Sequence, residues 1–211
     1  MGISLPKVYP ILDSAIVPTV GRVGFLDRLA QSLADAGVWV MEYRNKPDSD
    51  AQVLEDARVL RAAMPWAALI LDDRVDVAMA AGFDGVHVDA GDLPPLDARS
   101  LMGAEATIGT SAGSEAQLSE ALASGADYIA FGPVFPTTTK QTSAAPIGID
   151  GVRRFRAQAG AGPLLVAAAG ITLETAPEIL AAGADCVAVS AAIFRAGDSA
   201  AEFRRWMEVL G

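Results

Sequence analysis

Short runs of apolar residues recur along the chain, each separated from the next by a longer segment rich in alanine. Eight such runs stand out, at residues 8–12, 38–41, 67–71, 86–88, 106–109, 128–131, 163–168 and 186–189. They lack the alternation of apolar and polar positions that marks a half-buried strand, so both faces of each predicted strand are expected to be buried. This pattern is typical of a parallel sheet covered by helices.

The segments between the runs carry apolar residues at spacings of three and four, which predicts amphipathic helices. The clearest examples span residues 25–36, 50–63 and 115–123. Four of the segments end in an Ala-Gly or Ser-Gly pair, at Gly37, Gly82, Gly125 and Gly183. Glycine suits the left-handed conformation that ends a helix, so each pair is predicted to turn the chain back into a strand.

Eight strand and helix units in 211 residues predict an α/β protein, with one (β/α)8 TIM-barrel domain over residues 1–211. The alternative is an open, doubly wound sheet, which usually carries a Gly-x-Gly-x-x-Gly turn after its first strand. Here the first strand is followed by Ser14-Ala15-Ile16-Val17-Pro18. The barrel is therefore the favoured prediction.

Composition narrows the classes of function. The chain is 52% hydrophobic and 20% charged, with a formal net charge of −10. No nucleic-acid partner is expected, because this charge would repel a polyanion. The apolar runs are too short to cross a bilayer and no signal segment is evident, so we expect a cytoplasmic protein without a membrane partner. The single cysteine, Cys186, excludes an internal disulfide.

Polar residues gather directly after the predicted strands. In a parallel barrel all strands end at the same rim, where barrel enzymes build their sites from the loops that follow. The residues are Arg44 and Lys46 after the second strand, Asp72, Asp73 and Arg74 after the third, His87, Asp89 and Asp92 after the fourth, Thr110 and Ser111 after the fifth, Thr137, Thr138, Thr139 and Lys140 after the sixth, Gly170 after the seventh and Ser190 after the eighth. We expect this one rim to carry the chemistry.

Lysine is scarce in the chain. Only three of the 16 basic residues are lysines, and two of them, Lys46 and Lys140, fall on the rim. Compact ammonium groups beside threonine hydroxyls and glycine-rich turns suit phosphate. Gly170 and Ser190 follow the last two strands, where barrels commonly bind a phosphate through backbone N–H groups.

Two carboxylates on adjacent loops, Asp73 and Asp92, are candidate metal ligands. Hard oxygen ligands suit Mg2+, which takes few protein ligands and completes its shell with water and phosphate oxygens. We therefore predict a Mg2+-bound diphosphate next to a second, separately held phosphate. Small phosphorylated molecules are the expected partners.

Some of these residues also have purely structural interpretations. Asp72 and Asp73 could cap a helix that starts at Val75. His87, the only histidine, is expected to be a hydrogen-bonded residue of a buried strand. The tryptophans are expected to pack helices against the barrel, at Trp39, Trp66 and Trp206.

Three stretches of the chain are distinctive. They are Leu71-Asp72-Asp73-Arg74-Val75-Asp76, Asp84-Gly85-Val86-His87 and, most specifically, Gly132-Pro133-Val134-Phe135-Pro136-Thr137-Thr138-Thr139-Lys140. Together they resemble the thiamine phosphate synthase family, and the resemblance runs from residue 9 to residue 193. It implies a barrel transferase that joins 4-amino-2-methyl-5-hydroxymethylpyrimidine diphosphate to a thiazole phosphate, giving thiamine phosphate and pyrophosphate. The family is thought to react dissociatively, with the diphosphate leaving first.

The resemblance implies a role for each residue on the rim. Arg44, Lys46 and Lys140 would hold the diphosphate and act catalytically, by stabilising the charge that develops as it leaves. Ser111 would assist them. Asp73 and Asp92 would ligate Mg2+. The thiazole phosphate would be bound by Thr137, Thr138, Thr139, Gly170, Ser190 and Ala191.

The chain departs from the family pattern around the expected pyrimidine. Glu42 stands where the family usually has glutamine, and Asp72 where it usually has asparagine. Both positions are expected to bind substrate, and a carboxylate there would repel a diphosphate unless a cation compensates or the acid is protonated. Asn45 replaces the usual glutamate between Arg44 and Lys46. The diphosphate site is thus expected to be retained, while the pyrimidine pocket differs.

Two other functions stay open. A related thiazole tautomerase shares the fold but uses a histidine in the loop after the fifth strand, and residues 110–114 contain none. A catalytically silent barrel that binds a phosphorylated ligand is kept open by Glu42 and Asp72. The sequence leaves a homo-oligomer open in each case.

Overall fold

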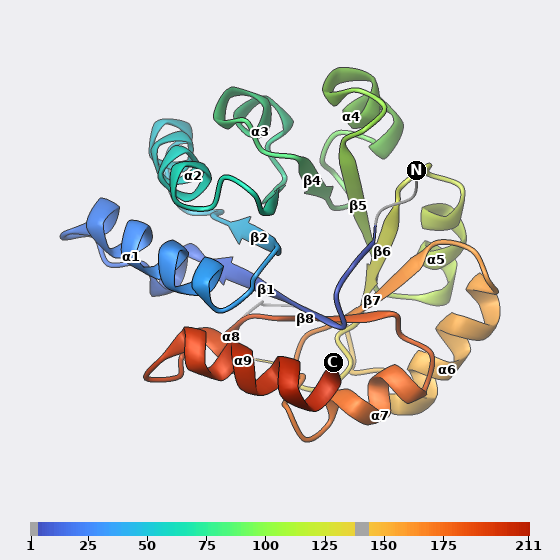
Figure 1. Ribbon diagram of the computed structural model, residues 1–211. Coiled ribbons are helices and arrows are strands. Elements are labelled where there is room, and N and C mark those ends of the chain that lie inside the picture. The colour runs from blue at the N-terminus through green and yellow to red at the C-terminus, as the bar shows by residue number, and fades with distance from the viewer. Residues whose placement is uncertain (1–3, 138–143) are drawn as a thin grey trace.

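The computed structural model describes residues 4–137 and 144–211. Within these residues the strands run parallel and close into a barrel in chain order, because β1 pairs with both β2 and β8 (Figure 1). The strands are β1 Val8–Asp13, β2 Val40–Arg44, β3 Ala68–Asp72, β4 Gly85–Val88, β5 Thr107–Ala112, β6 Tyr128–Phe131, β7 Leu164–Ala168 and β8 Cys186–Val189. The prediction of a TIM barrel is confirmed.

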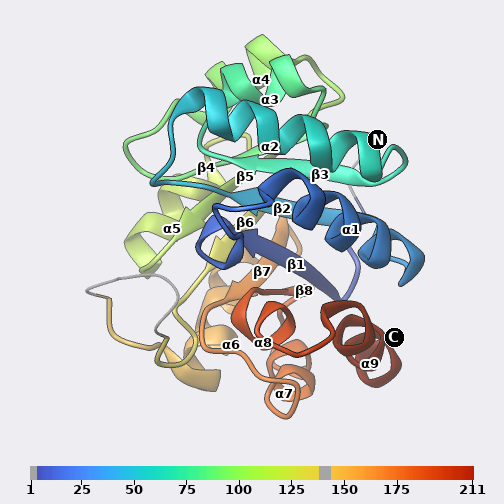
Figure 2. The same ribbon diagram turned by 90° about the vertical axis from the view of Figure 1, so that its left-hand side faces the viewer.

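A ring of helices surrounds the strands (Figure 1). The helices are α1 Arg22–Asp35, α2 Asp50–Ala63, α3 Val75–Ala81, α4 Pro95–Met102, α5 Glu115–Leu122, α6 Gly148–Ala159, α7 Ala176–Ala181, α8 Ala191–Phe194 and α9 Ser199–Leu210, with a 3-10 turn η1 at Ser14–Ile16. The last helix, α9, packs against α1, α8 and β1 (Figure 2). It therefore covers the junction between the first and last strands.

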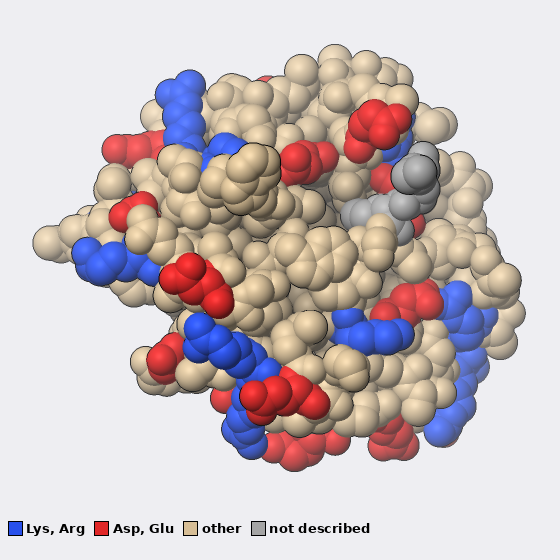
Figure 3. Space-filling view, in the orientation of Figure 1, with Lys and Arg blue, Asp and Glu red and all other residues tan. Residues whose placement is uncertain are grey.

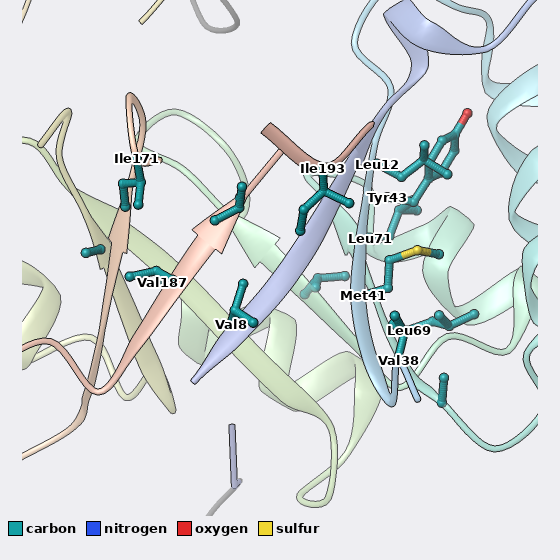
Figure 4. Close-up of a cluster of buried hydrophobic side chains, with 14 of the residues drawn as sticks. Val8, Leu12, Val38, Met41, Tyr43, Leu69, Leu71, Ile171, Val187 and Ile193 are labelled. Atoms are coloured by element: carbon teal, nitrogen blue, oxygen red, sulfur yellow. The ribbon is translucent and has the colours of Figure 1, made fainter. Parts of the chain in front are cut away.

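Two layers of apolar side chains hold the barrel together, because alternate residues of each strand point to opposite sides. The inner layer consists of Tyr9, Val40, Ile70, Tyr128, Ala130, Val166, Cys186 and Ala188. Their strand neighbours, such as Val8 and Met41, belong to the outer layer under the helices (Figure 4). Two residues beyond Val40 and Ile70, the inward positions become polar, at Glu42 and Asp72. The apolar filling thus gives way to a polar site toward the strand C-termini.

The predicted strands match the observed ones in order, but β1 and β3 end one residue later than predicted, and β2 and β5 end three residues later. β2 continues through Arg44, which pairs in register with Asp13 of β1, and β5 continues through Ala112, which pairs with Phe131. Polar residues at the mouth of a barrel end the apolar pattern before the strand itself ends. The glycines predicted to turn helices into strands all have φ between 71° and 118°.

The prediction for the tryptophans is wrong at two of the three positions. Trp206 of α9 is fully buried, but Trp39 is 43% exposed and Trp66 is 95% exposed. Trp39 precedes β2 and Trp66 precedes β3, at the end of the barrel opposite to the strand C-termini. The sequence around an apolar residue just before a strand does not indicate whether a helix covers that residue.

Three repeated ion pairs, which we call the Asp–Arg clamps, join neighbouring strands at this opposite end. In each, an aspartate that directly precedes a strand accepts a backbone N–H of the strand before it, over 2.7 or 2.8 Å, and pairs with an arginine from the helix before that. The sets are Asp84 with Leu69 and Arg61, Asp127 with Ile108 and Arg99, and Asp185 with Leu165 and Arg156. They fasten β3 to β4, β5 to β6 and β7 to β8.

Charges of both signs are distributed over the surface. On the face seen in Figure 3, lysines and arginines are interspersed with aspartates and glutamates. Among the helices of the described ranges, none has the length and apolar character needed to span a membrane. On this face an anion would have to be bound by a local arrangement of groups, because no broad basic patch is present there.

Candidate active site

β2 brings three charged residues to the mouth of the barrel. Glu42 and Arg44 are alternate residues near the end of the strand, and Lys46 follows in the loop. Arg44 Nη1 donates to Asp13 Oδ2 of β1 at 2.6 Å. Asp13 is 7% exposed, and its Oδ1 accepts the N–H of Ala15 at 2.9 Å, so its carboxylate is fixed from both sides. The Arg44 guanidinium is thereby held at the mouth.

Lys46 points across to the C-terminal end of β3. Its Nζ lies 3.0 Å from Asp72 Oδ2 and 3.1 Å from Asp73 Oδ2. Burial would lower the pKa of Lys46, but the two carboxylates outweigh it and raise that pKa. Asp72 is 6% exposed, and its Oδ2 also lies 3.7 Å from Arg44 Nε. The acid at position 72 therefore has two cations beside it.

Asp73 and Asp92 come together at the same mouth. Asp73 has a φ of 77°, which is unfavourable for a residue with a side chain, and its N–H donates to His87 O at 2.8 Å. The interaction with Asp92 is the largest cause that lowers the pKa of Asp73, whereas burial and then Asp73 raise the pKa of Asp92 to about 6. Asp92 Oδ2 also accepts the N–H of Asp89 at 2.8 Å. Two carboxyl groups in contact are stable only with a proton or a cation between them.

The structural interpretation of Asp72 and Asp73 as helix caps can be compared with the start of α3. Neither residue occupies the N-cap position of α3, which is Arg74, so the helix-cap interpretation is wrong. Asp73 and Asp92 offer hard carboxylate oxygens from adjacent loops, a donor set that fits Mg2+. In residues 4–137 and 144–211 no group of three or more Asp, Glu, His or Cys residues is arranged to hold a metal. A divalent ion would therefore take most of its ligands from water and substrate.

Beneath the mouth, Glu42 lies in the barrel interior. It is 3% exposed and its Oε2 accepts a hydrogen bond from Tyr9 OH at 3.3 Å. Burial is the largest cause that raises the pKa of Glu42 to about 7; Asp72 and Asp89 add to the increase, and His87 opposes it. Near neutral pH this carboxyl group can therefore carry a proton and donate a hydrogen bond.

His87 connects this interior to Ser111. Its Nδ1 lies 3.1 Å from Tyr128 OH and its Nε2 lies 2.8 Å from Ser111 Oγ. The Tyr128 ring crosses Gly109, where an added Cβ would come within 2.1 Å of Tyr128 Cζ, so only glycine leaves room for it. The expectation that His87 is a hydrogen-bonded residue of a buried strand is confirmed. In that position it also fixes the Ser111 hydroxyl.

Two cavities of about 350 Å³ each open at the mouth. The β5–β6 cavity is lined, among other residues, by Ser111, Gln117, Phe131 and Pro133. The β7–β8 cavity is lined, among other residues, by Asp13, Arg44, Gly170, Ser190 and Ala191. Both cavities are lined by Thr137, Ala168 and Ala169. The mouth thus contains two adjoining compartments of similar size with a shared wall of small residues.

The β7–β8 cavity has left-handed backbone along one side. Ala169 and Gly170 have φ of 70° and 73°. Successive N–H groups in turns of this kind can form a concave site for an anion. At Gly170 an added Cβ would lie 2.5 Å from Phe135 O, so a larger residue does not fit. Ser190, at the N-cap of α8, lines the same cavity.

Part of the predicted site lies outside the described residues, namely Thr138, Thr139 and Lys140. The other predicted residues lie at or near the strand C-termini or in the loops that follow them, except Ala191, which is the first residue of α8. They are Glu42, Arg44, Lys46, Asp72, Asp73, Asp92, Ser111, Thr137, Gly170, Ser190 and Ala191.

Two residues of this site, Asp13 and Tyr9, are not among those predicted from the sequence. Asp13 fixes Arg44, and it could have been found, because it directly follows the first apolar run as the other rim residues follow theirs. Tyr9 donates to Glu42, but an aromatic residue inside a buried strand gives no sequence signal of such a role.

Comparison with known proteins assigns this arrangement to a family. A model of the family described as Thiamine monophosphate synthase matches residues 8–193. The chain belongs to this family. A thiamine-phosphate synthase from Koribacter versatilis (strain Ellin345) is 40% identical over 191 residues, which cover 90% of each chain. One from Agrobacterium fabrum is 38% identical over 199 residues, which cover 92% of this chain and 90% of that protein.

Solved structures agree with membership of the thiamine monophosphate synthase family. Thiamine phosphate pyrophosphorylase from Pyrococcus furiosus has a TM-score of 0.81 at 31% identity, and the match covers 97% of both chains. A 3-hexulose-6-phosphate synthase has a TM-score of 0.68 at 17% identity, covering 98% of this chain and 100% of the other, and it is similar in fold alone. The resemblance carried by the three sequence stretches is therefore confirmed.

Proposed function

We propose that this chain is a thiamine-phosphate synthase that joins 4-amino-2-methyl-5-hydroxymethylpyrimidine diphosphate to a thiazole phosphate and releases pyrophosphate. Membership of the family supports this reaction, since relatives matched over nine-tenths of the chain carry the name. The observation that carries the proposal is the pair of adjoining cavities of about 350 Å³ at the barrel mouth, where Arg44 lines one cavity and Lys46 follows in the loop after β2. Two phosphorylated reactants can meet across the wall that these cavities share.

Each reactant has its own set of binding groups. The thiazole phosphate binds in the β7–β8 cavity, at the left-handed turn of Gly170 and beside Ser190 and Ala191. Thr137 completes its site from the shared wall, and the sequence resemblance adds Thr138 and Thr139 as ligands of the same phosphate. The pyrimidine diphosphate extends from Ser111, which lines the β5–β6 cavity, to the cations Arg44 and Lys46 of β2 and the loop after it.

The reaction exchanges one bond for another at the methylene carbon of the pyrimidine. The carbon–oxygen bond to the diphosphate breaks, and its electron pair leaves with the oxygen. The thiazole nitrogen supplies the pair for the new carbon–nitrogen bond. No proton has to be removed for this bond to form, so the reaction needs no side-chain base. Preorganised cations, which are Arg44, Lys46 and Lys140, stabilise the charge that grows on the departing oxygen.

Asp73 and Asp92 are the residues that hold Mg2+ in this proposal. When bound, the ion supplies positive charge to the leaving diphosphate. The contact between the two carboxyl groups supports this assignment, because it marks a point where a cation is favourable. Lys46 Nζ, 3.1 Å from Asp73 Oδ2, faces the same diphosphate.

The test is to mix the purified protein with both substrates and Mg2+ and to quantify thiamine phosphate and pyrophosphate together. We expect equal amounts of the two products. Pyrophosphate without thiamine phosphate would indicate hydrolysis, and the lack of both products would contradict the proposal.

Glu42 and Asp72 favour one alternative, a barrel that binds the thiazole phosphate without turning it over. Both acids are at least 94% buried at the expected pyrimidine side, with exposed fractions of 3% and 6%. Calorimetric binding of the thiazole phosphate, with no product in the mixed assay, would support this alternative. If the double variant Glu42→Gln and Asp72→Asn then formed product, these two acids would be the cause of the missing activity.

A further inference from the structure

A buried ion-pair cluster lies behind β2, on the helix side of the barrel wall. Asp56 of α2 is 0% exposed. Arg22 of α1 donates to it from Nε to Oδ1 at 2.8 Å and to Oδ2 at 3.0 Å, and from Nη2 to Oδ2 at 2.6 Å. Tyr43 OH of β2 also donates to Oδ2. None of these three residues reaches the cavities at the mouth.

Asn45 joins this cluster to the loop after β2. It is 9% exposed, and its Nδ2 donates to Tyr43 OH and to Asp48 Oδ2, each at 3.0 Å. Its Oδ1 accepts the N–H of Asp48 at 3.3 Å, which closes the loop on itself. Arg22 Nη2 lies 2.7 Å from Asp48 Oδ2 as well. We call Arg22, Tyr43, Asn45, Asp48 and Asp56 the β2 anchor.

Stability alone is a weak reason for such a cluster. The cost of removing two charges from water largely offsets their attraction, so a buried ion pair adds little net stability. What it does provide is a fixed geometry, since moving any member would leave a buried charge unpaired. The segment fixed here is the one that carries Lys46, whose Nζ reaches Asp72 and Asp73 at 3.0 and 3.1 Å.

We propose that Asn45 is a positioning residue, which acts through Lys46 to set the binding of the diphosphate, with the rest of the β2 anchor as its support. A lysine side chain is flexible, so its ammonium group is placed only if its backbone is fixed. An amide suits position 45 because it donates to Asp48 and accepts a backbone N–H at the same time. The inference rests on the proposed function in so far as it takes a diphosphate as the ligand of Lys46.

The test is a double-mutant cycle with inorganic pyrophosphate and Mg2+ as the probe, measured by calorimetry on the full chain. Asn45→Ala should weaken pyrophosphate binding by about tenfold, which corresponds to a coupling of usual size for residues in contact. In protein that already carries Lys46→Ala, the same substitution should change binding by less than about twofold. If Asn45 had only a structural role, Asn45→Ala would weaken pyrophosphate binding by the same factor in the native chain and in the Lys46→Ala variant.

Two further variants keep the test decisive. Ile179→Val, in the buried core of α7, removes one methylene at a cost of about 1 kcal/mol in stability and should leave pyrophosphate binding unchanged. If Asn45→Ala fails to fold, Asp48→Ala removes the loop partner of Asn45 at a side chain that is 32% exposed. It should also weaken binding, again only when Lys46 is present.

The inference would be overturned if Asn45→Ala weakened pyrophosphate binding equally with and without Lys46, or if it left binding unchanged. A protein that binds Mg2+ and pyrophosphate but makes no thiamine phosphate would refute the proposed function, while the cycle would still decide the role of Asn45. A protein that binds no pyrophosphate at all would overturn both.

Discussion

At the scale of single residues, the two acids that depart from the family pattern are accommodated in different ways. Asp72 lies between Lys46 and Arg44, so its charge is met by cations. Glu42 is deeper and is bonded to the neutral Tyr9 hydroxyl, and burial raises its pKa to about 7. One acid therefore works as part of an ion pair and the other as a group that can hold a proton.

The three lysines allow a comparison within one chain. Lys46→Ala and Lys140→Ala should each lower turnover by roughly 10²-fold or more, because in the proposed reaction each lysine supplies a charge that stabilises the departing diphosphate. Lys7→Ala is the control, since Lys7 is exposed ahead of β1 at the opposite end of the barrel. The measurement is the rate of pyrophosphate release at saturating substrates. Full activity in either rim variant would contradict its assigned role.

Glu42 gives a prediction about pH. Its pKa is higher in the folded protein, at about 7, than in the unfolded chain, so the folded state binds the proton more tightly. The resulting stability is fully present below the pKa of the unfolded chain and is lost as the pH rises toward 7. Glu42→Gln removes this dependence, so the variant should gain stability relative to the native chain between pH 5 and pH 8.

The gain should be about 1.4 kcal/mol for each unit by which the two pKa values differ. Urea unfolding at the two pH values measures it. Glu120→Gln, the same substitution at an exposed position of α5, is the control and should show no such difference. If the free energies of unfolding of the native chain and Glu42→Gln changed with pH in parallel, the folded state would not favour the protonated carboxyl group of Glu42.

At the scale of elements, the apolar pattern predicted each described strand because a parallel barrel strand is buried on both faces. It missed the ends of β2 and β5, where the inward positions are Arg44 and Ser111. It also missed the contact of Asp13 with Arg44, which depends on the register between two strands. Pairings of this kind follow from the closed barrel and not from any local stretch of sequence.

The β2 anchor was unpredictable for a related reason. Its members come from α1, β2, the following loop and α2, and each has an ordinary local role for a charged or polar residue. The Asp–Arg clamps were not predicted from the sequence either. The partners of each aspartate lie in the preceding helix and strand, 15 to 29 residues away in the chain.

The clamps predict a loss of stability without a loss of catalysis. Asp127→Ala leaves the N–H of Ile108 and the guanidinium of Arg99 without their shared acceptor, so it should destabilise the fold by about 1–3 kcal/mol. Turnover below the melting temperature should stay unchanged, because the clamp lies at the end away from the site. Asp35→Ala, at an exposed position of α1, should change stability by less than about 0.5 kcal/mol.

Thermal unfolding and steady-state turnover measured on the same samples check this. A large fall in turnover at full folding would mean that the two ends of the barrel are coupled.

At the scale of the whole molecule, an acidic protein must bind two anionic reactants. The net charge is −10, so the attraction of a diphosphate has to come from groups at the mouth. There Arg44 and Lys46 are already paired with Asp13, Asp72 and Asp73. Further positive charge is therefore needed when the diphosphate binds, which is the role proposed for Mg2+.

Removal of the metal tests this charge balance. Treatment with a chelator should abolish pyrophosphate release, and added Mg2+ should restore it. Asp73→Asn should need a higher Mg2+ concentration for half-maximal rate, because a neutral amide replaces one of the two carboxylates. Asp35→Asn, far from the mouth, should match the native chain. Unchanged turnover in the chelator would contradict a metal requirement.

The wall of Thr137, Ala168 and Ala169 between the two cavities limits how this enzyme can diverge. Two of its three side chains are single methyl groups, so any enlargement there would narrow both cavities at once. The volume of one cavity cannot be altered at this partition independently of the other. New ligand preferences would have to arise at the outer margins of either compartment, where a change of volume acts on one cavity alone.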